Sequence, residues 1–196
     1  MNARTSISRA LMALALSAGV AGCVNLGPKA PETLLSLRPT SAPAAGASAS
    51  GTLATALVVL EPAAEARVAV TRIPVQIDDS NVAYLTKTLW VERPSRLFQR
   101  LLAETIRAKG NRLVIEANPG GTGMQLSGRL LDMGYDARSR SAVVRFDAVK
   151  TGTGGKIDTR RFESIVPVTE AEAQYVGPAL NEAANTVAQA VADWVG

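Results

Sequence analysis

The stretch of sequence that decides the fold is MQLSGRLLDMGYDARSRSAVVRFDAVKTGTGGKIDTRRFESIV, residues 124–166. It contains three segments rich in apolar, β-branched and aromatic residues, at about 124–136, 141–149 and 157–166. The gaps between them read ARSR and KTGTGGK, and gaps of this length are typical of hairpins. The stretch therefore predicts a β-meander.

Two helices flank this meander in the sequence. Pro94 suits the first position of a helix because its missing N–H costs nothing there, and Gly110 provides a stop. Between them, apolar positions recur at spacings of three and four on one face, and polar residues, including Gln99, fall on the other. The apolar face comprises Leu97, Phe98, Leu101, Leu102, Thr105 and Ile106. These features predict a first helix at about 94–108. An alanine-rich segment at 175–194 has the same periodicity and predicts a second helix.

Shorter apolar runs predict the remaining strands, at 33–37, 53–60, 66–77, 81–91 and 112–116. In the run 81–91 we expect Val82 and Tyr84, with Leu85 and Leu89, to face the core. The expected fold class is α+β. We expect a single compact α/β sandwich with a mixed, mostly antiparallel sheet of about six to seven strands and two amphipathic helices.

The amino terminus has the pattern of a targeting signal. Arg4 and Arg9 precede an apolar run at 10–20, and Val20, Ala21, Gly22 and Cys23 follow. Eleven residues of helix span roughly 16 Å, about half of the hydrocarbon core, so this run is typical of a secretory signal and not of a membrane-spanning helix. The residues Val20-Ala21-Gly22-Cys23 resemble a bacterial lipobox, in which cleavage precedes an acylated cysteine. The other interpretation is an ordinary secretory signal that contains a buried cysteine.

These features predict the domain organisation. Residues 1–22 form a lipoprotein signal peptide, 23–32 a lipidated tether, and 33–196 one folded domain. Within that domain, residues 38–51 consist almost only of Ala, Ser, Gly, Pro and Thr and predict a flexible linker.

Composition excludes several chemistries. The chain has 196 residues, no histidine and one cysteine, so it has no Ser-His-Asp or Cys-His triad, no His/Cys zinc site and no internal disulfide. The formal charge of +4 falls to +2 once residues 1–22 are removed, because Arg4 and Arg9 leave with them and 19 basic face 17 acidic residues. We expect no nucleic-acid binding, since the eight aromatics are scattered and form no stacking platform.

Three patterns that could carry chemistry have simpler explanations. NPGGTG at 118–123 lacks the lysine of a phosphate-binding loop and leads into a strand. Asp78-Asp79-Ser80-Asn81 lacks the distal glutamate of a calcium loop and reads as a turn. The carboxylates are numerous enough for a glycosidase pair, but nothing in the sequence brings two of them together. We therefore expect no catalytic residue, no metal site and no bound cofactor.

Several segments, in their order, resemble the ABC-type transport auxiliary lipoprotein family. They are the lipobox, TLLSL, RIPVQIDDSNVAYLTKTLWVERPSRLFQRLLAETI, LSGRLLDMGYD, AVVRFDAV, RRFES and ALNEAANTVAQAVADWVG. The resemblance implies a non-enzymatic lipoprotein whose only added group is the covalent lipid, such as palmitate, on Cys23. It also implies that the lipoprotein functions together with an MCE-domain protein, an ABC permease and an ATPase, which move lipids between membranes. Val24 is not the Asp that marks inner-membrane retention, so the implied location is the periplasmic face of the outer membrane.

Other roles remain open at the level of sequence. A lipid-anchored scaffold or activator of a peptidoglycan enzyme would use the same anchor, and a lipid carrier would need an apolar cavity. A homo-oligomer is also compatible with the family. Tyr84 and Trp90 are candidate partner-binding residues, because aromatic residues are enriched at interface hot spots, but packing in the core would explain them as well.

Overall fold

The computed structural model describes residues 33–110, 112–116 and 123–196. All of them belong to one compact unit, Pro31–Gly196. The expected signal peptide, the tether and most of the NPGGTG run lie outside these residues. The elements in chain order are β1 (Thr33–Leu35), β2 (Leu57–Val59), β3 (Ala63–Ala64), β4 (Pro74–Gln76), β5 (Val82–Tyr84), β6 (Thr88–Trp90), α2 (Pro94–Arg107), β7 (Val114–Ile115), β8 (Met124–Asp136), β9 (Ser141–Thr151), the 3₁₀ turn η2 (Thr153–Gly155), β10 (Ile157–Pro167) and α3 (Ala173–Val195).

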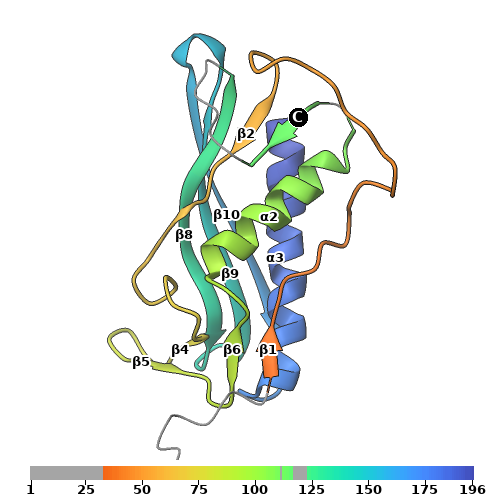
Figure 1. Cartoon of the computed structure of the whole chain (residues 1–196). Helices are drawn as coiled ribbons and strands as arrows, with labels where there is room; N and C mark the ends of the chain where they lie inside the picture. Colours follow the sequence, from red (N-terminus) through yellow and green to blue (C-terminus); the bar gives the residue numbers. More distant parts are fainter. Residues whose placement is uncertain (1–32, 111, 117–122) are drawn as a thin grey trace, which may run out of the picture. The chain divides into compact units, whose positions relative to one another are not determined.

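The predicted meander forms the centre of the structure. β8, β9 and β10 pair antiparallel, and the short strands β2, β3 and β4 add parallel to β8 on its other side. β7 and β5 complete an eight-stranded sheet, while β1 and β6 form a separate parallel pair. Both helices cover one face of the large sheet (Figure 1). The α+β class and the two helices are confirmed. The structure has more strands than expected because β3 is too short to leave a pattern and the run 81–91 forms two strands, β5 and β6.

Helix α2 has the apolar face that the sequence predicts. Leu97, Phe98 and Leu101 are at most 5% exposed, and the ring of Phe98 meets that of Phe146 on β9 edge-on, with centroids 5.2 Å apart. Gln99 departs from the prediction, since it is 9% exposed instead of lying on the solvated face. Its Nε2 donates to the carbonyls of Val59 (2.9 Å) and Glu116 (3.1 Å), which explains why a polar side chain is buried there.

Helix α3 packs against α2 and the meander along nearly its whole length. Its buried face consists largely of alanine and valine, and these small side chains let the helix approach the sheet closely. Trp194, near its end, contacts Phe162 of β10 edge-on with centroids 5.7 Å apart. The burial of apolar area between helices and sheet is the main stabilising contribution to such a fold.

A β-bulge interrupts the alternation of β8. Leu130 pairs with Phe146 and Asp132 with Arg145, so Leu131 is an extra residue without a partner. The extra residue shifts the alternation of side chains by one position. Leu130 and Met133 therefore both face the helices, although they are three residues apart.

Three predicted strands are wrong in their extent. Only 74–76 of the run 66–77 is a strand, because Glu65 accepts the N–H groups of Val68 and Ala69 in a turn. The run 81–91 is divided into β5 and β6 by a turn in which Lys87 has a φ of 62°. Val82 is 39% exposed instead of buried in the core, because β5 pairs only with β4 at the margin of the sheet. The run 53–60 likewise contributes only β2, after a turn at Thr52–Ala56.

The segment expected to be a flexible linker has no helix or strand between residues 38 and 51. Its beginning is attached to α3 by hydrogen bonds. The N–H of Arg38 donates to Asn181 Oδ1 at 2.8 Å, and the N–H of Thr40 donates to Asn185 Oδ1 at 2.7 Å. The flexibility of the segment stays a prediction.

Candidate functional site

The predicted lipidation motif, Val20 to Cys23, lies outside the described residues, and its role remains a prediction. Within the folded unit, the sheet face opposite the helices carries rows of charged side chains. We call this surface the open face; it is defined by Arg129, Asp132, Arg145, Asp147, Arg161 and Glu163.

The open face results from strand alternation next to a buried core. Phe146 and Ala148 of β9 are about 1% exposed and point to the helices, so their neighbours Arg145 and Asp147 point the other way. Arg161 of β10 is the register partner of Asp147. Opposite charges directly across a sheet attract each other and stabilise the pairing of the strands.

One row of alternating charge crosses the sheet from β3 to β10. Arg129 Nη1 lies 3.1 Å from Glu65 Oε1, and Arg129 is the register partner of Asp147. Arg161 then binds Asp147 through two atoms, Nε to Oδ1 at 2.6 Å and Nη2 to Oδ2 at 2.7 Å. The hydrogen bond from Arg161 lowers the pKa of Asp147 below its usual 3.8. We call this row Glu65-Arg129-Asp147-Arg161 the first ladder.

A second row runs parallel to the first with the signs reversed. Arg67 Nη2 lies 3.0 Å from Asp132 Oδ2, Asp132 is the register partner of Arg145, and Arg145 is ion-paired with Glu163. Burial raises the pKa of Asp132 above 3.8, and the charge and hydrogen bond of Arg67 oppose that shift. We call the row Arg67-Asp132-Arg145-Glu163 the second ladder.

Arg67 also holds the bulge of β8 in place. Its Nη2 donates to the carbonyl of Leu131 at 3.3 Å, and its Nη1 donates to Gln76 Oε1 at 2.6 Å. The arginine thus provides a partner for the carbonyl of the extra residue. The sequence contained no signal for this role, since Arg67 fell within a predicted strand.

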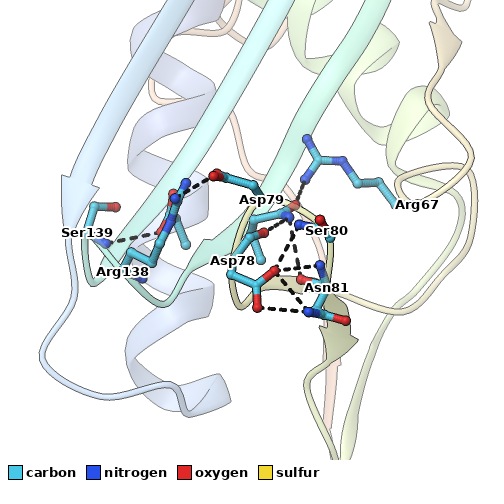
Figure 2. Close-up of polar contacts among 9 residues, drawn as sticks. Arg67, Asp78, Asp79, Ser80, Asn81, Arg138 and Ser139 are labelled. Carbon is cyan, nitrogen blue, oxygen red and sulfur yellow. Dashed lines mark hydrogen bonds and ion pairs between the residues drawn. The ribbon is translucent and has the colours of Figure 1, made fainter.

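The loop Asp78–Asn81 is a turn, as the sequence indicated. Asp78 Oδ1 accepts the N–H groups of Ser80 (2.9 Å) and Asn81 (3.0 Å), and the Asn81 side chain donates to the same carboxylate (Figure 2). These bonds, the Asn81 side chain first, lower the pKa of Asp78. The Asp78 carboxylate accepts the hydrogen bonds that close the turn, and this role accounts for the acidic residue at this position.

Arg138 joins this turn to the hairpin between β8 and β9. Its Nη1 lies 2.7 Å from Asp79 Oδ1, and Figure 2 shows the two side chains turned toward each other. In the hairpin, Asp136 Oδ1 accepts the N–H groups of Arg138 (2.8 Å) and Ser139 (3.1 Å). The two turns are thus capped by aspartate in the same way, and an exposed ion pair connects them.

The two predicted partner-binding residues have different surroundings. Trp90 is 2% exposed and belongs to the core, the alternative that the sequence left open, while Tyr84 is half-buried under the guanidinium of Arg72, 4.1 Å from its ring centroid. The structure does not bring them together into one surface. Their part in partner binding stays a prediction.

A groove of about 560 Å³ runs along α3 beside Thr40. Seven of the nine residues that line it have polar side chains, among them Asn181, Asn185 and Asp193. Among residues 33–110, 112–116 and 123–196, no three His, Cys, Asp or Glu side chains gather as metal ligands. Within the same ranges, every helix is too short or too polar to cross a bilayer.

The fold and the open face together define an α+β domain with a two-helix layer on one side of the sheet and paired charges on the other. The chain belongs to the family of ABC-type transport auxiliary lipoprotein components, whose model matches residues 35–192. The resemblance stated from the sequence is thereby confirmed. No curated protein matches the chain in sequence.

Two solved structures share the fold. The crystal structure of protein XCC0632 from Xanthomonas campestris is 14% identical with a TM-score of 0.70, covering 83% of this chain and 94% of the other. The crystal structure of an uncharacterized protein is 12% identical with a TM-score of 0.65, covering 72% and 92%. PelC from Paraburkholderia phytofirmans, described as a dodecamer, is 16% identical with a TM-score of 0.38, covering 79% and 93%.

Proposed function

We propose that this chain is a non-enzymatic lipoprotein that completes an ABC-type transport system at the periplasmic face of the outer membrane. Membership in the family of auxiliary lipoprotein components, over residues 35–192, carries the proposal. The sequence before the domain agrees with it, because the basic start, the short apolar run and Val20-Ala21-Gly22-Cys23 have the arrangement of a lipoprotein signal.

Cys23 is the anchor in this proposal. At about 0.8 kcal/mol per buried methylene, one acyl chain binds a membrane only marginally, whereas two or three hold it stably. Residues 23–32 separate the acylated cysteine from β1 and reach at most about 30 Å when extended. The domain would therefore stay within one domain diameter of the membrane surface.

The partner in this proposal is an MCE-domain protein that works with the ABC permease and ATPase. Anchoring confines the domain to a thin layer at the membrane and raises its effective concentration, so a weak docking surface suffices. A role without catalysis agrees with the open face, where the acidic side chains are paired with arginine and none is left as a free acid or base. The ladders are thus suited to contacts between proteins.

Replacement of Cys23 tests the anchor. In cells fed a radiolabelled palmitate, the wild-type chain should incorporate label and sediment with outer membranes. Cys23→Ala should lose the label and accumulate as the unprocessed precursor, while the neighbouring change Asn25→Ala should behave as wild type. Label retained by Cys23→Ala, or its complete absence from the wild type, would contradict the anchor.

Capture from crosslinked cells tests the partner. The anchored chain, tagged at its C-terminus, should co-purify with an MCE-domain protein, identified by mass spectrometry. The Cys23→Ala variant should capture much less of it, because its effective concentration at the membrane is lost. Wild-type capture of cell-wall synthases without any MCE-domain protein would replace this proposal by the scaffold alternative.

A further inference from the structure

β10 is the long edge strand of the sheet. It pairs with β9 from Ile157 to Pro167 in an unbroken register, and it stands at the end of the strand order. In the ranges that the structure describes, no other strand pairs with its second side. Exposed edges of this length attract further strands unless they are covered. The opposite edge offers no comparable strand, since β7 has two residues and β5 three.

The direction of the backbone groups of β10 follows from its ladder with β9. The N–H of Val168 donates to the carbonyl of Arg140, which continues the β9 register by one step. Because backbone groups alternate along a strand, the even-numbered residues of β10 point to β9 and the odd-numbered ones point outward. Pro167 is one of the outward residues, and proline is accepted at an edge because no N–H is needed there.

Two outward residues of β10 carry the terminal charges of the ladders. Arg161 ends the first ladder with a positive charge, and Glu163 ends the second with a negative one. Both side chains lie on the open face, two residues apart, and both residues are exposed. The edge therefore presents one cation and one anion in a fixed order.

We infer that β10 pairs antiparallel with β10 of a second copy of this chain, in the register centred on Phe162. In that register Arg161 lies opposite Glu163 of the second copy, and Glu163 lies opposite its Arg161. The first ladder of each copy then continues into the second ladder of the other copy, and positive and negative side chains alternate along the whole row. The two pairs would also exchange backbone hydrogen bonds, because all four residues point outward.

The charges select this register against its neighbours. Pairing centred on Arg161 would place two arginines opposite each other, and pairing centred on Glu163 would oppose two glutamates. Like charges directly opposite each other destabilise a strand pair. The register centred on Phe162 alone brings opposite charges together at both positions.

The arrangement is compatible with an anchor on each copy. The pairing continues the sheet, so both helix layers lie on one side. β1 lies near the end of the sheet where β10 terminates (Figure 1), so the two β1 strands would lie at opposite ends of the joined sheet. The inference itself requires neither lipid on Cys23 nor a transport partner, so it can fail while the proposed function stands.

Charge reversal provides a test with an internal rescue. In the full chain purified in detergent, Arg161→Glu and Glu163→Arg should each weaken self-association about tenfold or more, as measured by sedimentation. When the two variants are mixed with different tags, each should capture the other, because every Glu then faces an Arg. The double variant should recover self-association.

Arg160→Glu is the matched control. It makes the same charge change one residue away, on the helix side of the strand, and should leave self-association unchanged. Thermal unfolding of each variant verifies that it is folded. A wild-type chain that stays monomeric, single reversals that still self-associate, or a mixed pair that associates no better than each variant alone would overturn the inference. Association through another surface, or capture of a different protein by this edge, would do so as well.

Discussion

The side-chain oxygen of Asn185 on α3 accepts the backbone N–H of Thr40 at 2.7 Å, a contact between residues 145 positions apart in the chain. The amide nitrogen of the same side chain donates to the carbonyl of Arg38 at 2.9 Å. Asn185 therefore holds the backbone on both sides of Pro39. It is 7% exposed, so its polar groups depend on these partners.

Asn185→Leu should destabilise the domain. The substitution keeps the approximate size but leaves the groups of Arg38 and Thr40 without this partner, a loss of about 1–3 kcal/mol in the free energy of unfolding. Urea unfolding measures the loss, and amide exchange should show that the Thr40 N–H loses protection. Thr186→Leu, on the exposed side of the same helix turn, is the control and should change stability by less than about 0.5 kcal/mol. Unchanged protection at Thr40 would contradict the role of Asn185.

Gln99→Leu should have a comparable effect at the other helix. Its Nε2 bridges the carbonyls of Val59 and Glu116, so an apolar replacement removes two hydrogen bonds at once, at a cost of about 1–3 kcal/mol. The exposed Gln174→Leu provides the comparison and should be close to neutral. Equal stability of the two variants in chemical unfolding would show that the bridge contributes nothing.

Gly134→Ala tests the close approach of β4 to β8. A Cβ at Gly134 would lie 2.5 Å from the carbonyl oxygen of Pro74, so one of the two strands would have to shift. We expect a loss of about 1–3 kcal/mol, as for overpacking in other cores. Gly152→Ala is the matched change, since its nearest neighbour would be 3.7 Å away. A crystal structure of Gly134→Ala with β4 unmoved, or wild-type stability, would disprove the constraint.

The two aspartates of the open face should titrate on opposite sides of 3.8. The Asp147 pKa is lowered by the hydrogen bond from Arg161, and the Asp132 pKa is raised by burial. Asp147 therefore stabilises the fold above pH 3.8 and loses this contribution as the pH falls through its lower folded pKa. Asp132 has the opposite sign, because stability decreases as the pH rises from 3.8 through its folded pKa.

Carbon-13 NMR titration of the carboxyl carbons measures both values. Arg161→Ala should return the Asp147 pKa toward 3.8 and leave Asp132 unaffected. Arg67→Ala should raise the Asp132 pKa further, since the opposing charge is removed. Indistinguishable titrations of the two carboxyls in the wild type would refute the assignment.

The sequence was sufficient for the long elements of the fold. The meander, α2 and α3 each contain enough residues for a periodic pattern, and the structure confirms them within a few residues. The strand β3 could not be predicted, since it has two residues and owes its existence to pairing with β8, whereas β7 falls within the predicted run 112–116. Val82 was misplaced because β5 pairs only with β4, at the margin of the sheet, and none of its three residues is fully buried.

The open face shows what kind of site escapes sequence reasoning. The arginines and acids were visible as separate charges, and surface solvation was the simplest interpretation of each. Their order in two ladders depends on the cross-strand register, and that register depends on the bulge at Leu131. No local pattern encoded the bulge, whose carbonyl is held by Arg67 from another part of the chain.

The small parallel pair β1 and β6 has a mechanical consequence. Thr33, Leu34 and Leu35 pair with Thr88, Leu89 and Trp90, and the chain runs on from there to the contacts of Asn185. If Cys23 is fixed in a membrane and a partner pulls on the domain, the tension enters the fold at Thr33, the first residue of β1. A pull along the strand loads the backbone hydrogen bonds between β1 and β6 together in shear, instead of opening them one after another. The three residues of β1 thus bear a load from the tether first, before it reaches the meander.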